Sequence, residues 1–389
     1  MKNAMKLIAI ATAIVVASFN AVAQNPTQDG AAAAPDAWLF VRDGQPWWYK
    51  TTASPKPVDL RRREPNTAEQ PLVERVKNLM ATRPARAFAL VDGDAVVYQR
   101  FNAPASDDAV IFGFSMGKTV TAMAVGQAVC ANKMKMETRA SELIPQLNGK
   151  ALGNATVRDL LKMASGTTEG NADTSVWSPE QARAWSLGNL NLVDLVTDER
   201  VAKAQRGVFS EFKPGETFAY KSTDPHTLAI MTAKSTGMPW SQWVQQSVLN
   251  PMGMAKAGLY VQDRTQNGLA DSGMRMSIDD WIRFAIWVKR SSAEQGCFGD
   301  FVRDAMKTQI KNGSGPNDRR FGKAFGGYGY FIWTENSAAP NTAWALGWGG
   351  QRIGWSTDPA NSRMIVTFSN VENWQQEASE LARDWMRLK

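Results

Sequence analysis

The chain has 389 residues, 44% of them hydrophobic and 21% charged, which is typical of a globular protein and not of a disordered or fibrous one. Its net charge of +7 is scattered, and no basic stretch alternates with aromatic residues, so we expect no nucleic-acid partner. One histidine and two cysteines, none at the spacing of metal ligands, predict no metal site.

The first 23 residues have the pattern of a secretory signal peptide. Lys2 and Lys6 precede an apolar run over 7–19, and Ala21-Val22-Ala23 matches a small-residue cleavage site. The run is too short for a comfortable membrane span. We therefore expect cleavage after Ala23, export to a periplasm and no stable membrane insertion; an uncleaved N-terminal anchor is the alternative.

Residues 24–70 are interpreted as an N-terminal extension, and Trp47-Trp48-Tyr49 indicates that part of it packs on the body. The main domain is then expected over 71–389. It opens with a short helix over 72–80 and a hairpin of strands over 88–91 and 96–98. An apolar strand over 111–114 leads to Ser115, where an apolar and therefore buried helix begins and runs to about 131.

The middle of the chain is predicted to be helical, and its last part to contain strands. Helical patterns cover 157–164, 191–204, 227–235, 240–249 and 278–289, with Asp224-Pro225 as a helix start. Strand patterns cover 325–333, 344–353 and 364–370, followed by a helix over 377–387. This order predicts an α+β fold, with one antiparallel sheet built from both chain ends, flanking helices and an inserted helical subdomain over roughly 135–320.

Ser115-Met116-Gly117-Lys118 is an S-x-x-K motif at the start of the apolar helix. Lys118 lies one turn after Ser115, on the same face. The helix N-terminus offers N–H groups to a developing oxyanion, and burial disfavours the charged form of a lysine, which can then accept the serine proton. A second match, Ser210-Glu211-Phe212-Lys213, runs into Pro214-Gly215, which break a helix; this context favours Ser115.

Two further motifs follow. Tyr220-Lys221-Ser222 is a Y-x-S sequence, and a tyrosine near two positive charges can act as a base. Gly347-Trp348-Gly349-Gly350-Gln351 lies inside a strand-like run, where glycines often mark the approach of a ligand to the backbone.

Together the three motifs resemble those of the serine β-lactamase-like hydrolases, which include class C β-lactamases, D-alanyl-D-alanine peptidases, carboxylesterases and 6-aminohexanoate-dimer hydrolases. The family has S-x-x-K, then Y-x-N or Y-x-S, then a K-T-G-type strand, and the resemblance covers roughly residues 75–389. Leu160-Leu161 followed by Ser165-Gly166 also resembles a family segment.

Two departures narrow the expected activity. Ser222 stands where classical β-lactamases have asparagine, and residues 345–350 contain no K-T-G, whose lysine attracts the carboxylate of the drug. The Gly-Gly-Gln ending looks more like the esterase and 6-aminohexanoate-dimer hydrolase branches. Arg352 or Lys221 could restore the missing charge.

The resemblance implies a catalytic serine, Ser115, with Lys118 and Tyr220 handling protons. It implies an oxyanion hole from the backbone N–H groups of Ser115 and Trp348, with Gln351 as the alternative to Trp348. The substrate contacts that we expect are Ser222, Gly349, Gly350, Gln351 and Trp177.

We therefore expect a serine hydrolase that cleaves uncharged esters or small amides through an acyl-enzyme, without metal or organic cofactor. The alternatives are a β-lactamase or D-alanyl-D-alanine peptidase, and a penicillin-binding sensor that does not turn over. The sequence leaves the oligomeric state open.

The remaining candidates have structural interpretations. His226 is expected to be a satisfied histidine in a helix, and Trp177 and Trp185 to pack in the core or to form a lid. Cys130 and Cys297 form a disulfide or serve separately as small core residues; the sequence leaves both open.

Overall fold

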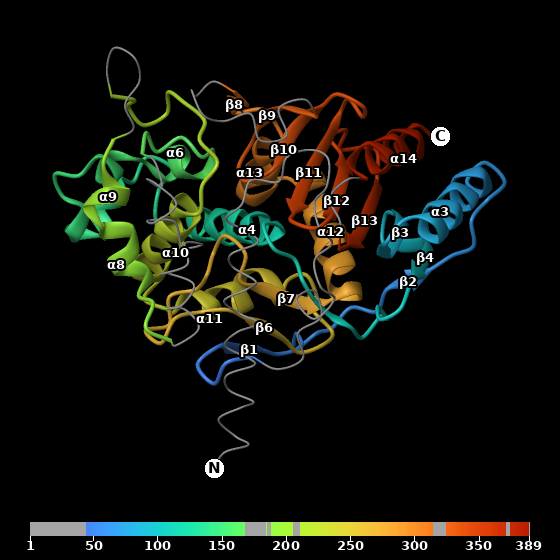
Figure 1. Ribbon diagram of the computed structural model, residues 1–389, viewed down its shortest axis with the longest axis horizontal. Helices are drawn as coiled ribbons and strands as arrows, with labels where there is room; N and C mark the ends of the chain where they lie inside the picture. Colours follow the sequence, from blue (N-terminus) through green and yellow to red (C-terminus); the bar gives the residue numbers. More distant parts are fainter. Residues whose placement is uncertain are drawn as a thin grey trace.

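The computed structural model describes residues 44–167, 184, 188–204, 211–313, 324–370 and 374–388 (Figure 1). The predicted signal peptide, Trp177, Trp185 and Ser210 lie outside these residues. Within the described part of the chain, no helix is both long and apolar enough to cross a membrane.

Strands from both ends of the chain form one large sheet, as predicted. Its order is β2-β4-β3-β13-β12-β11-β10-β9-β8, antiparallel except for the β2–β4 pair. Its strands are β2 (Arg61–Arg62), β3 (Ala85–Asp92), β4 (Ala95–Phe101), β8 (Ile310–Lys311), β9 (Phe325–Tyr328), β10 (Trp333–Asn336), β11 (Thr342–Gly347), β12 (Gln351–Ser356) and β13 (Arg363–Ser369).

A second, smaller sheet has the order β1-β6-β7-β5 and was not predicted. Its strands are β1 (Tyr49–Thr51), β5 (Val110–Phe112), β6 (Gly258–Tyr260) and β7 (Met274–Ser277). They have two to four residues in register with a partner, too few for periodicity to reveal. Because β1 pairs with β6, the extension before residue 70 packs on the body, as expected.

The helices of the described chain cover both faces of the large sheet. They are α3 (Gln70–Thr82), α4 (Met116–Cys130), α5 (Ala140–Leu143), α6 (Val157–Leu161), α8 (Leu192–Thr197), α9 (Glu199–Ala202), α10 (Thr223–Thr236), α11 (Trp240–Val244), α12 (Ile278–Ala293), α13 (Cys297–Ala305) and α14 (Gln375–Arg387). Short 3-10 turns η1 (Pro145–Leu147) and η2 (Ala151–Asn154) and a π-helical turn η3 (Gln245–Leu249) complete the set.

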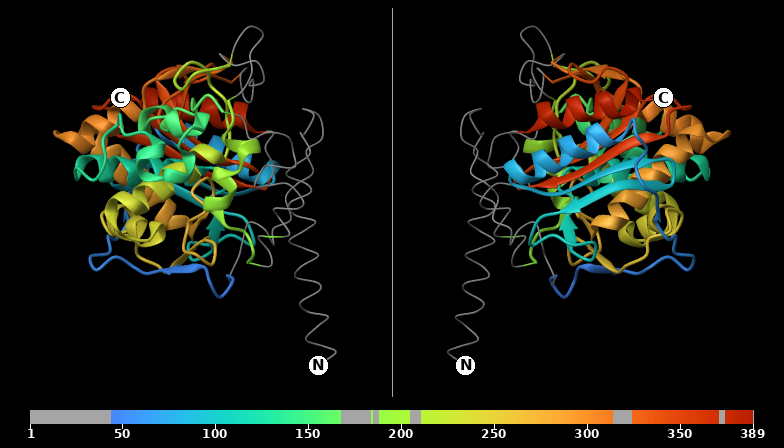
Figure 2. Two further views of the ribbon diagram at one scale, coloured as in Figure 1. Left: turned by 90° about the vertical axis from the view of Figure 1, so that its left-hand side faces the viewer. Right: turned by 90° about the vertical axis from the view of Figure 1, so that its right-hand side faces the viewer.

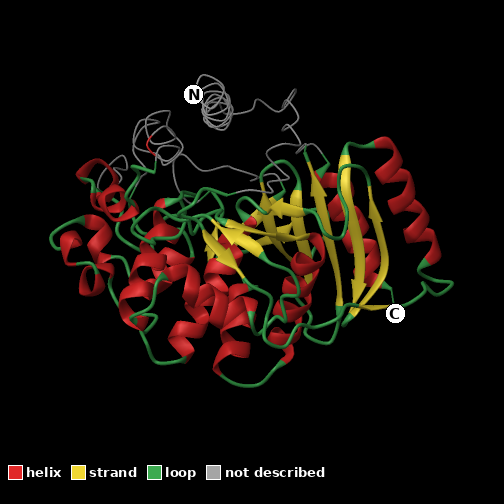
Figure 3. Ribbon diagram, turned by 90° about the horizontal axis from the view of Figure 1, so that it is seen from below, coloured by secondary structure: helices red, strands yellow, loops and turns green. Residues whose placement is uncertain are grey.

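The two helical layers are unequal. Helices α3 and α14 lie side by side against β3 and β13 (Figure 2). Helix α4 contacts β11 and β12 and is surrounded by α10, α11 and α13, so it lies between the sheet and the helical region (Figure 3). This position explains why α4 is apolar on every side, since a helix buried all round has no polar face.

Three local predictions need correction. The run over 344–353 is not one strand but a hairpin, with a turn at 348–350 in which Gly349 and Gly350 have positive φ. The N-cap residue of helix α10 is Ser222 and not Asp224. The Asp224 carboxylate instead accepts a hydrogen bond from Ser165 and pairs with Lys221. The helix over 191–204 is broken at Asp198, which caps a new helix by accepting a hydrogen bond from Arg200 N.

Cys130 and Cys297 form a disulfide, which settles the alternative that the sequence left open. The bridge joins the last residue of α4 to the first residue of α13. The C-terminal end of the central helix is therefore covalently tied to a neighbouring helix.

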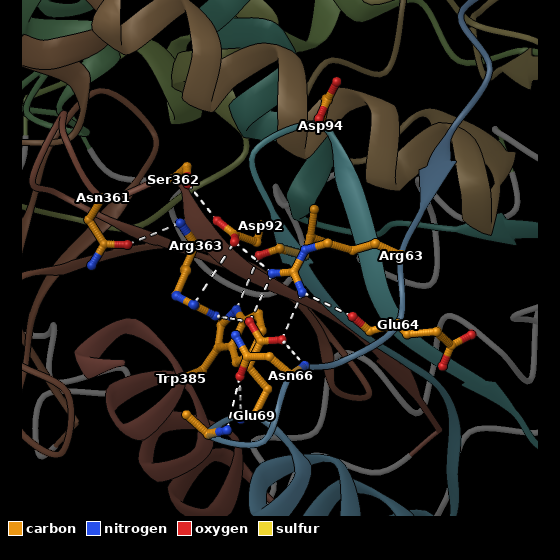
Figure 4. Close-up of polar contacts among 12 residues, drawn as sticks. Arg63, Glu64, Asn66, Glu69, Asp92, Asp94, Asn361, Ser362, Arg363 and Trp385 are labelled. Carbon is orange, nitrogen blue, oxygen red and sulfur yellow. Dashed lines mark hydrogen bonds and ion pairs between the residues drawn. The ribbon is translucent and has the colours of Figure 1, made fainter. Parts of the chain in front are cut away.

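An ion-pair network joins the first and last parts of the domain where the end of β3 meets the start of β13 (Figure 4). Glu69 at the start of α3 is fully buried and accepts hydrogen bonds from Arg63 and from Arg363 of β13. Arg63 also donates to Asp92 at the end of β3, and the Arg363 guanidinium stacks on Trp385. The bond with Arg63 lowers the pKa of Glu69 to about 2, against the opposing effect of burial.

Candidate active site

Ser115 stands at a sharp turn between the small sheet and the central helix. Strand β5 ends at Phe112, and Phe114 has φ of +47°, a value that bulky residues rarely adopt. Ser115 is the N-cap residue of α4 and is half-buried. The strained turn therefore places Ser115 at the N-terminal end of α4, where the N–H groups of Met116 and Gly117 donate back to the carbonyls of residues 113 and 114.

The Lys118 ammonium contacts Ser115 directly. Its Nζ donates to Ser115 Oγ at 3.1 Å, and only 2% of the Lys118 surface is exposed. Between them, Gly117 lies against the Ser272 backbone, where a Cβ would come within 3.0 Å of Ser272 Cα. The absence of a side chain at 117 thus lets α4 approach the segment 271–272 closely enough for Lys118 to reach it.

Asp271 faces Lys118 and was missed by the sequence analysis. Its Oδ2 lies 3.8 Å from Lys118 Nζ, and its backbone carbonyl accepts a hydrogen bond from Nζ at 3.3 Å. Its carboxylate also accepts hydrogen bonds from Ser222 at 2.6 Å and Ser272 at 2.7 Å. Burial acts to raise the pKa of Asp271, but the Lys118 charge, His226 and these hydrogen bonds together lower it. The carboxylate is therefore held in its charged form beside the lysine.

Tyr220 lies on the other side of Lys118. The lysine Nζ is 4.8 Å from the centre of the tyrosine ring, and the ring is stacked on Trp333 with centroids 5.4 Å apart. Tyr328 meets the same ring edge-on. Strands β9 and β10 therefore fix the orientation of the tyrosine that the sequence selected.

The two residues after Tyr220 each contact a buried carboxylate. Ser222 donates its hydroxyl to Asp271, and Lys221, 4% exposed, lies 3.3 Å from Asp224 Oδ2. Ser165 also donates to Asp224. Burial raises the pKa of Asp224, against the effect of Lys221. Lys221 is thus paired with Asp224 inside the protein. It does not replace the lysine that the K-T-G motif would place on the third strand.

His226 is fully buried, but it is not the satisfied histidine that the sequence predicted. Neither ring nitrogen has a hydrogen-bond partner among the described residues, and Nε2 lies 3.8 Å from Asp271 Oδ1. Burial lowers the pKa of His226 to about 4, so the ring is neutral at pH 7. It is separated from Lys118 by the Asp271 carboxylate, which both residues face.

The turn between β11 and β12 lies against the turn that precedes Ser115. A Cβ on Gly347 would come within 2.2 Å of the Gly113 carbonyl oxygen, so only glycine permits this approach. The Trp348 ring meets the Phe114 ring edge-on at 5.3 Å. The β11–β12 turn is therefore held against residues 113 and 114, which directly precede Ser115.

The side chain of Gln351, which the sequence analysis predicts to contact the substrate, bonds to backbone groups of the protein. It is fully buried, and its Nε2 donates to the carbonyls of Trp348 and Ser369, while its Oε1 accepts from Ser369 N. This side chain ties the turn to β13. Arg352, the next residue, donates through Nε to Gln375 at the start of α14, on the opposite face of the sheet from α4. Gly349 and Gly350 are buried in the turn.

Comparison with known proteins gives a family. The family model described as Beta-lactamase matches residues 72–387. A curated β-lactamase of Providencia stuartii is 23% identical over 202 residues, which are 50% of this chain and 47% of that protein. The chain thus matches about half the length of this relative.

Several solved structures have the same fold. A Bacillus anthracis protein assigned as a 6-aminohexanoate-dimer hydrolase has a TM-score of 0.69 and 18% identity, covering 87% of this chain and 89% of that one. EstCE1, a hydrolase with promiscuous acyltransferase activity, has a TM-score of 0.61 and 14% identity over 82% and 98% of the two chains. A β-lactamase/D-alanine carboxypeptidase from Pseudomonas syringae has a TM-score of 0.58 and 16% identity over 82% and 99%. At these identities the likeness concerns the fold.

Proposed function

The chain belongs to the β-lactamase family, and from this premise we propose that it is a serine hydrolase that cleaves ester or small amide bonds through an acyl-enzyme on Ser115. The observation that carries the proposal is the contact of Ser115 Oγ with Lys118 Nζ at 3.1 Å, with the Asp271 carboxylate 3.8 Å behind the lysine. A base within hydrogen-bond reach of a hydroxyl, itself oriented by a third group, is the arrangement that activates a serine.

The reaction begins when Ser115 Oγ attacks the carbonyl carbon and Lys118 takes the hydroxyl proton. Asp271 stabilises the ammonium that results, because opposite charges attract strongly where water is excluded. The oxygen that becomes negative is bound by the N–H groups of Ser115 and Trp348. Tyr220 donates its phenolic proton to the leaving group and receives the proton held by Lys118. A water molecule then attacks the acyl-enzyme and gives a proton to Lys118, which returns it to Ser115 Oγ as the acid leaves.

The charges near the site favour an ester or amide without a carboxylate beside the scissile bond. The β11–β12 turn carries Trp348 and glycines where the resembled β-lactamases carry a lysine, and both cations that could replace it have other partners. A charge-assisted contact contributes more than a neutral one, so its loss penalises penicillins most. The fold is shared with a hydrolase that has promiscuous acyltransferase activity and with a protein assigned as a 6-aminohexanoate-dimer hydrolase, which supports this choice.

Ser115→Ala should abolish steady hydrolysis of p-nitrophenyl butyrate and labelling by a fluorophosphonate probe. The matched control is Ser210→Ala, which removes the serine of the second S-x-x-K match and should leave both intact. Labelling that persists in Ser115→Ala would place the nucleophile elsewhere. A burst without turnover in the wild-type protein would favour the penicillin-binding sensor.

The identity of the proton-handling groups has its own test. Lys118→Ala and Tyr220→Phe should each lower kcat by roughly two to four orders of magnitude, the usual effect of losing a proton-transfer group. His226→Ala should have a much smaller effect, because its ring faces Asp271 and not Ser115. A dead His226→Ala beside an active Tyr220→Phe would replace the lysine mechanism by a serine–histidine one.

We also propose that the protein is exported and cleaved after Ala23. The signal-peptide pattern of residues 1–23 supports this, and so does the disulfide, because such bonds persist in oxidising compartments. Mass spectrometry of the protein from its native host should find Gln24 as the first residue. An intact Met1 on a membrane-bound product would contradict the proposal.

A further inference from the structure

Arg275 of β7 is a buried cation, and no carboxylate in the described part of the chain pairs with it. Its side chain is sandwiched between two aromatic rings, with the guanidinium 4.5 Å from the centre of the Trp48 ring and 4.3 Å from that of Phe112. The residue is 8% exposed, and its Nε and Nη1 atoms have no hydrogen-bond partner among the described residues. Burial lowers the pKa of Arg275 to about 9, still well above neutrality.

Two other buried arginines of this chain have acidic partners. Arg283 is 7% exposed and donates to Asp280 at 2.9 Å and to the Val58 carbonyl. Arg363 is 8% exposed and donates to Glu69 at 2.8 Å. A buried charge without a partner destabilises the fold by more than stacking on aromatic rings returns. Stability alone therefore does not explain the buried guanidinium of Arg275.

The guanidinium is connected to the reaction centre by neighbouring residues. Arg275 pairs with Phe112 across the small sheet, and the adjacent Met274 carbonyl accepts a hydrogen bond from Gly113 N. The Phe112 ring lies 4.0 Å from the Phe114 ring, which in turn meets the Trp348 ring at 5.3 Å. An unbroken line of aromatic side chains therefore leads from Arg275 to the turn beside Ser115.

We propose that Arg275 is the anchor of a carboxylate-binding subsite, and that the preferred substrates carry a carboxylate at the far end of the acyl or leaving arm, beyond an apolar stretch. The inference rests on the proposed function. A guanidinium offers two parallel N–H groups that match a carboxylate, and one cation balances one negative charge. The aromatic line favours methylene groups between that carboxylate and the scissile bond. The Arg275 subsite differs from the site of the K-T-G lysine, which binds a carboxylate directly beside the scissile bond.

The test compares two pairs of substrates that differ only in one charge. The first pair is the p-nitrophenyl ester of suberic acid with its other carboxyl free or as a methyl ester. The second pair places the same difference on the leaving arm, with butyrate esters of 6-hydroxyhexanoic acid and of its methyl ester. In the wild-type protein, kcat/KM should be about 10- to 100-fold higher for the free carboxylate in one pair, the range for one hydrogen bond to a charged group.

Arg275→Met should reduce that preference to near unity, and Arg275→Lys should retain part of it. The matched control is Arg352→Met, another buried arginine, whose Nε donates to Gln375 on the far face of the sheet and which should keep the wild-type preference. Melting curves in suberate provide a readout independent of catalysis. The dianion should raise the melting temperature of the wild-type protein and not that of Arg275→Met.

The outcomes separate this inference from the proposed function. Hydrolysis of both members of each pair at equal rates, with no shift by suberate, would overturn the subsite and leave the serine hydrolase standing. A preference that survives Arg275→Met would also overturn it, because the carboxylate would then bind elsewhere. Failure to hydrolyse any of the four esters, with a suberate shift that depends on Arg275, would instead contradict the proposed function.

Discussion

Asp271 and Lys118 lie 153 residues apart in the chain and make the ion pair behind the nucleophile. The pair is almost fully buried, so neither charge is screened by water. Ser222 and Ser272 hold the carboxylate by its two oxygens. This explains the serine in the second motif, since a short hydroxyl at 222 reaches the carboxylate that in turn faces the lysine.

Asp271→Asn should lower kcat for ester hydrolysis roughly 100-fold, the order expected for losing one buried charge pair. Ser272→Ala is the control, since it removes one hydrogen bond and keeps the carboxylate. An Asp271→Asn protein with the kcat of the wild type would show that the carboxylate charge does not assist the reaction.

The sequence identified the residues that form local patterns and missed those brought together by the fold. Ser115 and Lys118 are one helical turn apart, and Tyr220 and Ser222 are two residues apart, so short motifs could find them. Asp271 and Arg275 carry no such spacing to any partner. They meet α4 and β5 only because β7 pairs with β5, and strands of three or four residues leave no periodicity to detect.

At the scale of elements, the β11–β12 hairpin decides how closely the sheet approaches the nucleophile. Gly347 at the end of β11 touches the Gly113 carbonyl, and Gln351 at the start of β12 fixes the turn to β13. The glycines of the strand-like run over 347–350 predicted that another group lies close to this backbone, and in the structure Gly347 lies against the Gly113 carbonyl. The periodicity could not show that the approach occurs at a turn, because a glycine-rich turn and a strand bend share the same composition.

Gly347→Ala should lower kcat by about 10²- to 10³-fold, the effect of losing one oxyanion donor. The new methyl group would lie 2.2 Å from the Gly113 oxygen, so the turn with Trp348 must move away from Ser115. Gly354→Ala is the control in the same hairpin: its methyl group meets the Trp344 ring, which should lower the melting temperature with little change in kcat. Equal losses of kcat in both variants would contradict a specific role for the turn.

The disulfide between Cys130 and Cys297 links the C-terminal end of α4, the helix that begins after Ser115, to α13. A double variant, Cys130→Ser with Cys297→Ser, should lower the free energy of unfolding by about 2–5 kcal/mol, as for other native disulfides. Urea unfolding measures this loss, and a reductant should lower the stability of the wild-type protein to that of the variant. Identical stability with and without reductant would mean that the bond does not form in solution.

At the scale of the whole molecule, the network around Glu69 fastens the beginning of the domain to its end (Figure 4). Glu69 is the N-cap residue of α3, Asp92 ends β3 and Arg363 begins β13. The carboxylates of Glu69 and Asp92 determine how the network responds to acid.

Glu69→Gln should lower the free energy of unfolding at pH 7 by about 2–3 kcal/mol, less than for an isolated buried pair because Asp92 still accepts from Arg63. The folded pKa of Glu69, about 2, lies below its ordinary value of 4.5. Its stabilisation is therefore complete above pH 4.5 and disappears as the pH falls toward 2. Urea unfolding from pH 7 to 3 measures the difference between the two proteins, which should shrink with acid.

The control for this prediction is Asp94→Asn, which removes an exposed ion pair with Arg61 two residues beyond Asp92. Exposed pairs contribute little, so its unfolding free energy should match that of the wild type within about 1 kcal/mol. A difference between Glu69→Gln and wild type that stays constant from pH 7 to 3 would mean that the carboxylate charge is not what stabilises the network.

The pairing of β3 with β13 also determines when the protein can fold. Asp92 and Ser362 contact each other across 270 residues of chain, and every strand between β3 and β8 in the large sheet is joined through β13. During synthesis, β3 therefore cannot pair with its neighbour until β13 has been made. Loop closure over such a distance is slow, and strand edges exposed meanwhile are prone to aggregate. We therefore expect the large sheet to be completed only in a late folding step.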